Sequence, residues 1–287
     1  MTENAIVADN LTYQYGDLTA VDHVGFQVAE REIFAFLGPN GAGKSTTVNM
    51  LTGQLKPKDG TATVLGMNVS EDPNKVQGKI GVCFEITNLY EQLSAKDNLI
   101  LFAKLFGVKD FDAEPLISRV GLDGRGEDLV ETYSKGMKQR LMVARSLVNR
   151  PEILFLDEPT EGLDPQSSLA IRNIILEERE RGATIFLTTH DMTEADKLSD
   201  RVAFIDGGKI AALDTPHNLK QQYGKRVLRA EVSAGDGKLQ EREIEMDKTG
   251  TAAEVEQLFE KEQVITVHTE EATLEDIFIQ ITGRALD

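Results

Sequence analysis

The sequence contains a single cysteine, no tryptophan and no long apolar run. Cys83 therefore cannot form an internal disulfide, and its apolar neighbours Val82 and Phe84 favour a buried thiol. No stretch reaches the ~18 apolar residues of a membrane span, and residues 1–4 lack the basic start of a signal peptide. We expect a protein of the reducing cytoplasm that has no lipid anchor and reaches a membrane only through a partner.

Basic residues are scarce as well. The chain has 31 Lys and Arg against 48 Asp and Glu, which gives a formal net charge of -17 at pH 7. Nucleic acids and anionic lipid surfaces bind basic surfaces, so this charge argues against both as partners. The 287 residues suffice for one large or two small domains with a substantial core. Acidic residues are dense from residue 241 onwards, which suggests a separate C-terminal unit.

A phosphate-binding loop is the strongest pattern present. The apolar run Ile33–Leu37 predicts a buried strand, and residues 46–51 are compatible with a helix. Between them lies a loop that we expect to bind nucleotide phosphates, and it consists of Gly38, Pro39, Asn40, Gly41, Ala42, Gly43, Lys44 and Ser45. Thr46, the next residue, is expected to take part in this binding. Lys44 is expected on the β- and γ-phosphates and Ser45 on Mg²⁺, beside the positive end of the helix dipole.

Two further predicted strands end in polar residues. Ile153–Leu156 leads into Asp157 and Glu158, and an apolar strand over residues 183–188 leads to His190. Ligands gather at the carboxyl ends of strands in open α/β sheets. We predict Asp157 as a Mg²⁺ residue and Glu158 as the catalytic base for the water that attacks the γ-phosphate. The alternatives are a turn or helix cap for the carboxylates and a surface role for the histidine.

The N-terminal part is predicted to be rich in β-strands, with one strand over residues 5–15, a turn at Gly16-Asp17 and a second strand over residues 21–28. Tyr15 is a candidate for stacking on adenine, with Tyr13 as the competitor and edge-strand packing as the default for either. Further strands are expected over 61–65 and 79–84. Helices are expected from Ser94 to Gly107, over 113–120, 136–148 and from about 166 to 181.

With these residues in place, the chain resembles the ATP-binding subunit of an ABC transporter over residues 3 to about 220. Five motifs occur in the family's order: residues 38–45 match Walker A, 133–139 the signature, 154–158 Walker B, 162–164 the D-loop, and His190 the switch histidine. The resemblance implies an α/β fold, that of the P-loop NTPase ABC ATPase domain, in which a mixed sheet carries a helical signature subdomain.

The same resemblance implies a dimer, either a homodimer or a pair with another ATPase subunit, with two ATP molecules at its interface. Ser134 and the backbone N–H of Gly136 would bind the γ-phosphate of the ATP held by the partner chain, and Asp164 would couple the two sites. His190 would orient the attacking water and act in catalysis with Glu158. Tyr15 would stack on adenine.

Two residues depart from the family pattern. Lys135 replaces the first glycine of the signature, while the key serine and the second glycine remain. Glu85 stands where the family has the Q-loop glutamine. A carboxylate can still reach Mg²⁺ and the nucleotide, but it adds a negative charge near the triphosphate and offers no amide donor. We expect nucleotide binding to persist, with altered Mg²⁺ affinity or turnover.

Residues 221–287 are expected to form a small C-terminal α+β appendage after an ATPase domain over residues 1–220. A helix is expected from Pro216 to Tyr223, strands over 226–232, 242–246 and 264–267, and a helix over 252–261. A final amphipathic helix is capped by Thr273. This ending resembles the subfamily that pairs with ABC-2 type permeases, which includes daunorubicin-resistance proteins. We favour a packing or dimer-contact role for the appendage over ligand sensing.

The sequence thus predicts an ATP-hydrolysing exporter subunit at the cytoplasmic face of the membrane, coupled to membrane-spanning permease subunits through residues 86–92. One alternative is a soluble ABC ATPase that acts on ribosomes or DNA repair. The single cassette and the charge of -17 argue against it. A nucleotide-dependent regulator with little hydrolysis is the other, and Glu85 gives it some support.

Overall fold

The computed structural model describes residues 4–233, 238–246 and 248–284, which divide into two compact units. Within the described residues the first unit covers 4–213 and the second 214–284. The sequence analysis placed the boundary after residue 220. The division falls earlier because helix α8 (Pro216–Tyr223) packs against α10 (Leu274–Thr282) in the second unit. No helix among the described residues is long and apolar enough to cross a membrane.

A six-stranded sheet forms the centre of the first unit, in the order β10-β9-β3-β8-β7-β6. β3 pairs in parallel with β8 and β9, and β7 with β6 and β8. All residues of β3, β7 and β8 are buried, which explains why their sequences are continuous rather than alternating apolar runs. The strands span Ile33–Leu37 (β3), Ile80–Cys83 (β6), Ile153–Asp157 (β7), Thr184–Thr189 (β8), Arg201–Asp206 (β9) and Lys209–Asp214 (β10).

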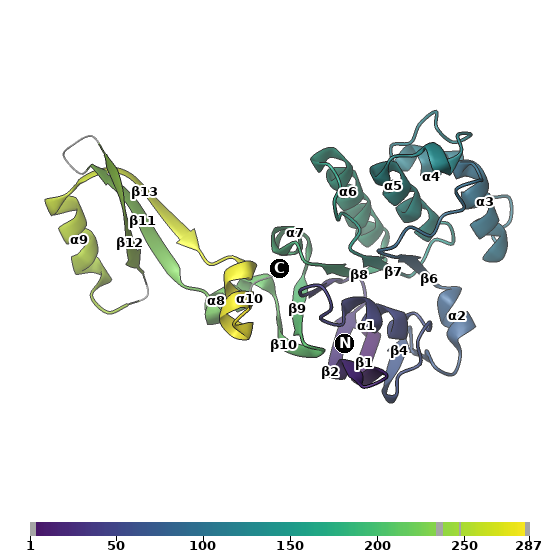
Figure 1. Cartoon of the computed structure of the whole chain (residues 1–287), viewed down its shortest axis with the longest axis horizontal. Coiled ribbons are helices and arrows are strands. Elements are labelled where there is room, and N and C mark those ends of the chain that lie inside the picture. The colour runs from purple at the N-terminus through teal and green to yellow at the C-terminus, as the bar shows by residue number, and fades with distance from the viewer. Residues whose placement is uncertain (1–3, 234–237, 247, 285–287) are drawn as a thin grey trace. The chain divides into compact units, whose positions relative to one another are not determined.

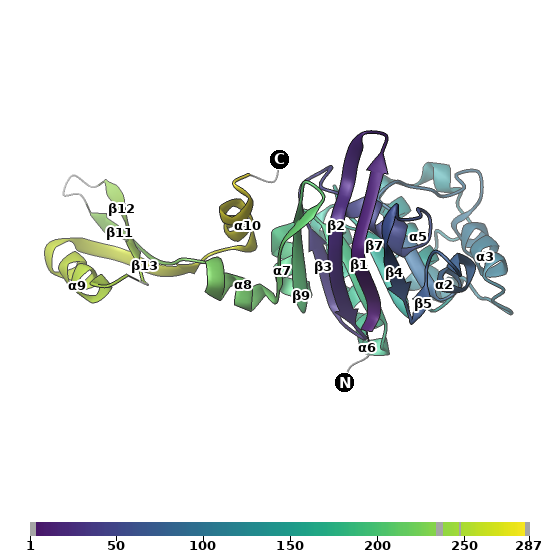
Figure 2. The same cartoon turned by 90° about the horizontal axis from the view of Figure 1, so that it is seen from below.

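A second, antiparallel sheet lies against the first and confirms the predicted β-rich entry (Figure 2). Its order is β2-β1-β4-β5, with bounds Asn4–Tyr15 (β1), Leu18–Ala29 (β2), Asp59–Val64 (β4) and Met67–Asn68 (β5). Packed phenylalanines fill the space between the two sheets. The Phe26 ring lies 5.3 Å from Phe34 and 5.8 Å from Phe186, centroid to centroid.

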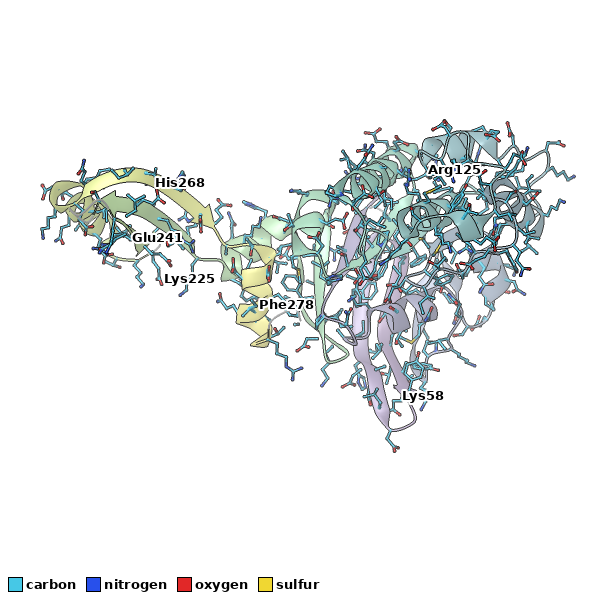
Figure 3. All side chains as sticks on the ribbon, turned by 45° about the horizontal axis from the view of Figure 1, so that its top comes forward. Lys58, Arg125, Lys225, Glu241, His268 and Phe278 are labelled. Atoms are coloured by element: carbon cyan, nitrogen blue, oxygen red, sulfur yellow. The ribbon has the colours of Figure 1, made fainter. Side chains whose placement is uncertain are left out.

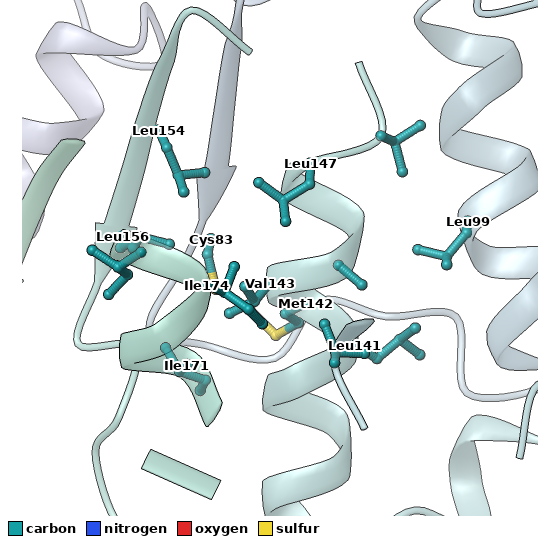
Figure 4. Packing of buried hydrophobic residues seen from close by; sticks show 14 of the residues in the cluster. Cys83, Leu99, Leu141, Met142, Val143, Leu147, Leu154, Leu156, Ile171 and Ile174 are labelled. Carbon is teal, nitrogen blue, oxygen red and sulfur yellow. The ribbon is translucent and has the colours of Figure 1, made fainter. Parts of the chain in front are cut away.

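Helices complete the first unit, and α3, α4 and α5 gather beyond β6 and β7 (Figure 1). Figure 4 shows apolar side chains such as Leu99 of α3 and Leu141 of α5 in the core between these helices and the sheet. The helices are Lys44–Leu51 (α1), Pro73–Gln77 (α2), Ala95–Leu105 (α3), Glu114–Arg119 (α4), Lys135–Ser146 (α5), Pro165–Arg181 (α6) and Met192–Leu198 (α7), with a 3₁₀ turn at Val130–Thr132. The sequence analysis missed α2 and α7, which are too short for a clear apolar period.

The second unit is the predicted α+β appendage. Its sheet has the order β12-β11-β13, with antiparallel pairing on both sides of β11. β11 (Arg226–Ser233) matches the predicted strand, whereas β12 (Leu239–Glu245) and β13 (Gln263–Glu271) are longer than predicted. Figure 3 labels Glu241 on β12 and His268 on β13. Helix α9 (Thr251–Lys261) covers one sheet face, and Thr273 caps α10 through a capping box.

Candidate functional site

The loop between β3 and α1 depends on glycine at two places. Gly43 has a φ of 109° and immediately precedes α1, and a Cβ there would lie 2.5 Å from the Ala20 carbonyl oxygen. A Cβ on Gly38 would lie 2.2 Å from the Ile205 carbonyl oxygen. The chain can pass between β2 and β9 only because neither residue has a side chain.

The N-terminus of α1 has backbone N–H groups that can bind an anion. Gly43 supplies no side-chain cap, and the first turn contains no acidic residue. The first amide groups of a helix have no intrahelical acceptor, so those of α1 can donate to a phosphate. A pocket opens at this point, and its lining residues are Ala20, Asn40, Gly41, Gly43, Lys44, Ser45, Thr46, Glu85 and Glu158.

Lys44 is almost fully buried beneath this pocket. Its Nζ donates to the carbonyl oxygens of Gly38, at 2.7 Å, and Pro39, at 3.3 Å. The same Nζ lies 3.1 Å from Oε1 of Glu158, and the two side chains are only 6% and 4% exposed. The sequence analysis assigned separate roles to these residues, and the structure joins them in a buried ion pair.

Glu158 follows β7 and is held in an uncommon backbone conformation. Its φ of 48° lies in the left-handed region, which non-glycine residues adopt rarely and mainly where the surroundings impose it. The Glu158 N–H donates to the Thr188 carbonyl oxygen at 3.1 Å. Its Oε2 lies 3.0 Å from Nδ1 of His190. The adjacent ends of β7 and β8 therefore bring together the predicted base and the predicted switch histidine.

Asp157 lies beside this group, at the end of β7. It accepts hydrogen bonds from the hydroxyls of Thr188 and Ser45. Burial raises the pKa of the Asp157 carboxyl, although these hydrogen bonds oppose the shift. Magnesium in phosphate sites takes one or two protein oxygens together with substrate phosphates, and Ser45 and Asp157 are such a donor pair. Over the described residues, no three His, Cys, Asp or Glu side chains gather into a metal site.

Glu85 brings a further carboxylate to the same pocket. Its pKa is raised, first by the loss of hydration and then by repulsion from Asp157, Glu161 and Glu158. Lys44 opposes this shift. Glu85 is therefore repelled by the three other carboxylates around it.

The remaining predicted residues gather elsewhere. Ser134 caps α5, and Asp164 caps α6 by accepting from the N–H groups of Gln166 and Ser167. The Ser167 hydroxyl and these N–H groups lower the pKa of Asp164. A Cβ on Gly136 would lie 3.3 Å from the Ser167 hydroxyl. The signature and D-loop segments therefore contact each other in one chain and do not line the phosphate pocket.

Tyr15 does not line the phosphate pocket. It is 49% exposed, and its ring meets that of Tyr13 edge-on at 4.9 Å between centroids. The assignment of adenine stacking to Tyr15, with Tyr13 as competitor, stays a prediction.

Thr188 also belongs to this group of residues, and the sequence analysis did not predict it. Its hydroxyl lies within hydrogen-bond reach of Asp157, the predicted metal residue, and of the Glu158 N–H, the predicted base. Its place at the end of the predicted strand over 183–188 was a usable signal, because polar residues at strand ends face the ligand in such sheets.

Comparisons with known proteins agree with this geometry. A family model described as ABC transporter matches residues 21–161. A fluoroquinolones export ATP-binding protein of Mycobacterium tuberculosis is 44% identical over 96% of this chain and 92% of its own length. The daunorubicin/doxorubicin resistance ATP-binding protein of Streptomyces peucetius is 37% identical over 92% of this chain and 77% of its own.

Two solved structures are similar as well. An ATP-binding subunit of an ABC transporter, 29% identical, superposes with a TM-score of 0.71 over 76% of this chain and 93% of that one. A dimeric ATP-binding cassette in a post-hydrolysis state, bound to ADP and phosphate, is 25% identical. It superposes with a TM-score of 0.67 over 73% of this chain and 98% of that one.

Proposed function

Because this chain belongs to the ABC transporter family of ATP-binding proteins, we propose that it hydrolyses ATP to drive an exporter whose membrane-spanning part lies on separate permease chains. The observation that carries this proposal is the chain of contacts from Lys44 to Glu158 to His190 beneath the phosphate loop, in which Lys44 and Glu158 are almost fully buried and His190 is half-buried. Glu158 lies within hydrogen-bond reach of both Lys44 and His190, which supports its role as base, that of Lys44 as a phosphate-binding cation and that of His190 as an orienting imidazole.

The chemistry follows from these contacts. An entering triphosphate competes with Glu158 for the Lys44 ammonium, because both are anions. Glu158 then has an oxygen available to accept the proton of the attacking water, while Nδ1 of His190, 3.0 Å from Oε2, holds its carboxyl group in place. Asp157 and Ser45 would hold Mg²⁺, which supplies charge neutralisation at the β- and γ-phosphates when bound.

We also propose that two such chains form a dimer. Ser134, Gly136 and Asp164 form a group of their own on the chain that carries them. In a pair of chains, the start of α5 would supply donors to the γ-phosphate held by the partner, and Asp164 would connect the two sites. Because Ser134 and Asp164 cap the helices α5 and α6, the backbone of both segments is already fixed in the single chain.

A groove on the first unit supports docking of a permease. Its walls come from the segment after α1, the end of α2, β6, α3 and α5, and its large apolar side chains are those of Ile80, Val82, Phe84, Phe102 and Phe106. The Arg145 guanidinium lies 4.6 Å from the centre of the Phe102 ring. It also donates to the Asn88 carbonyl oxygen, which ties the segment 86–92 to the groove. An amphipathic helix of a permease could place its apolar side in such a groove.

Export and location rest on the relatives. Their printed names are those of export and drug-resistance ATP-binding proteins. We place the chain at the cytoplasmic face of the membrane, held there by its permease. Isolating the tagged chain from native membranes in mild detergent tests this. Recovery with a polytopic membrane protein in equal amount supports the exporter, and recovery from the soluble fraction alone contradicts it.

The catalytic assignment is tested with Glu158→Gln. The amide cannot accept the proton of water, so we expect ATP turnover to fall at least ~100-fold while ATP binding is kept. Glu161→Gln is the matched control, because it removes a nearby carboxylate that does not line the phosphate pocket. Normal turnover in Glu158→Gln would remove Glu158 from the role of base. Negligible turnover in the unaltered chain would favour the regulator that Glu85 suggests.

A further inference from the structure

A second contact joins the two loops that carry Glu158 and His190. The hydroxyl of Thr160, two residues after Glu158, donates a hydrogen bond to Oε2 of Glu194. Glu194 lies in the first turn of α7, the helix that begins at Met192 directly after the histidine loop. The contact between Glu158 and His190 and the contact between Thr160 and Glu194 therefore close a ring that contains both loops.

Glu194 is held in place at three of its atoms. Its side chain is buried, and Oε1 lies 2.8 Å from Nε of Arg172 on α6. Oε2 accepts from Thr160, and the backbone N–H donates to Oδ1 of Asp191, the N-cap of α7, at 2.9 Å. A buried carboxylate with both oxygens bonded cannot move without leaving a partner unpaired, which is costly. Glu194 is thus a fixed point to which the Thr160 hydroxyl is attached.

The backbone of Glu158 needs such an attachment. Its φ of 48° persists only where the surroundings impose it. The hydrogen bonds of its N–H to Thr188 hold the residue from the side of β7. The next residue is Pro159, which has no N–H to donate. Thr160 is therefore the first residue after Glu158 that can anchor the chain through its side chain, and Glu194 is its acceptor.

We propose that Thr160 and Glu194 are positioning residues for ATP hydrolysis, and that their hydrogen bond sets the carboxylate of Glu158 relative to the imidazole of His190. This inference rests on the proposed roles of Glu158 and His190. Neither Thr160 nor Glu194 lines the phosphate pocket. The hydrogen bond consequently acts on the orientation of the base and not on nucleotide binding.

Losing this hydrogen bond has a distinct kinetic signature. Without it, the segment after β7 relaxes from the strained conformation, and Glu158 is less often oriented toward the attacking water. A misplacement of about 1 Å at a reacting group costs up to ~100-fold in rate. The loss falls on kcat, whereas KM for ATP stays the same, because the phosphate loop belongs to a different segment, between β3 and α1.

The experiment compares Thr160→Val, which removes the hydroxyl and keeps the shape, with Thr160→Ser, which keeps the hydroxyl. Thr184→Val is the matched control. Thr184 is also buried, and its hydroxyl accepts from the Arg31 N–H at 2.9 Å, at the end of β8 opposite to His190. ATP turnover is measured per bound nucleotide, so that unfolded protein is not counted, together with ADP affinity and the melting temperature.

We expect Thr160→Val to lower kcat about tenfold, with KM for ATP and ADP affinity within about twofold of the unaltered chain. Thr160→Ser should restore at least about half of kcat, because its hydroxyl can still donate to Glu194. Thr184→Val should lower the melting temperature and leave kcat unchanged. Thr160→Ala removes the same hydroxyl and takes the place of Thr160→Val if that variant does not fold.

An unchanged kcat in Thr160→Val, with only a lower melting temperature, would show that the hydrogen bond is purely structural and would overturn the inference. A double-mutant cycle with Glu194→Gln tests the partner. The two changes together should lower kcat by less than the product of their separate effects, since both weaken the same contact. Fully multiplicative effects would also overturn it. Normal turnover in Glu158→Gln would instead remove the catalytic role on which the inference rests.

Discussion

Lys44 and Glu158 form an ion pair that is almost inaccessible to water. Removing two charges from water is costly, and their attraction offsets this only in good geometry. The pair persists here because Lys44 also donates to Gly38 and Pro39 and Glu158 also contacts His190. A triphosphate can replace Glu158 as the partner of Lys44 without leaving the lysine unpaired. In the proposed mechanism, this arrangement would keep Glu158 away from water until a triphosphate binds.

Glu85 leads to a prediction about pH. Its pKa is raised in the folded chain, so the folded state binds the proton more tightly than the unfolded state. This contribution to stability is complete below the ordinary pKa and is lost as the pH rises through the raised value. Glu85→Gln removes the titration. We expect its melting temperature to exceed that of the unaltered, nucleotide-free chain by a margin that grows from pH 4 to pH 7.

Thermal unfolding at several pH values, without nucleotide or Mg²⁺, measures this margin. Glu91→Gln is the control, because the Glu91 carboxylate pairs with Lys138 and stands outside the phosphate pocket. A margin for Glu85→Gln that stays constant with pH would show that Glu85 titrates as an ordinary surface carboxylate.

At the scale of elements, strand ends position the site. β3, β7 and β8 are adjacent and parallel, so Leu37, Asp157 and Thr189 end at one edge of the sheet. The phosphate loop follows the first strand, the two carboxylates end the second, and His190 follows the third. Helix α1 then turns its free amide groups toward the same edge. Three distant segments meet because parallel strands share one direction.

The loop between β3 and α1 yields a prediction at this scale. Gly43→Ala and Gly41→Ala both place a side chain on a residue with positive φ, at a cost of about 1 kcal/mol each. A Cβ on Gly43 also meets the Ala20 backbone at 2.5 Å, whereas a Cβ on Gly41 meets nothing within 4 Å. We expect Gly43→Ala to lower the free energy of unfolding by a further ~1–3 kcal/mol, because β2 and the loop must separate.

Urea unfolding of the two variants gives the difference directly, and ADP affinity gives its functional effect. Gly43→Ala should bind ADP more weakly than the unaltered chain, since the displaced loop no longer directs its amide groups at phosphate. Equal stability of the two variants would mean that the loop can move away from Ala20 without cost.

The groove beside β6 is a feature of the tertiary structure, because its walls come from several elements spread over residues 52–146. Phe106 lies in its wall and is 38% exposed, while the neighbouring Leu105 is 69% exposed and lies outside it. Phe106→Ser should reduce recovery of the membrane partner at least ~5-fold and leave the ATP turnover of the isolated subunit unchanged, since buried aromatic anchors dominate interface energies.

Co-purification from membranes, with turnover of the purified chain as a second readout, measures this effect. Leu105→Ser is the matched control and should recover the partner normally. Equal recovery with Phe106→Ser and Leu105→Ser would contradict docking in the groove. A loss of turnover in Phe106→Ser would point to damage of the fold instead.

The sequence by itself determined the local patterns of this protein. A phosphate loop, the Asp157-Glu158 pair and the caps at Ser94, Asp164 and Thr273 are patterns of residues close together in the chain, and the caps accept hydrogen bonds only from the N–H groups two or three residues further on. The continuous apolar runs of β3, β7 and β8 likewise determined a buried parallel sheet.

Only the tertiary structure decided which of these patterns meet. It paired Lys44 with Glu158, brought Thr188 to Asp157, and set the signature and D-loop segments apart from the phosphate pocket. It also showed that α8 belongs to the second unit and that the Lys135 ammonium lies next to Gly162. Such contacts join residues far apart in the chain. They depend on sheet order and helix packing, which local propensity and periodicity do not specify.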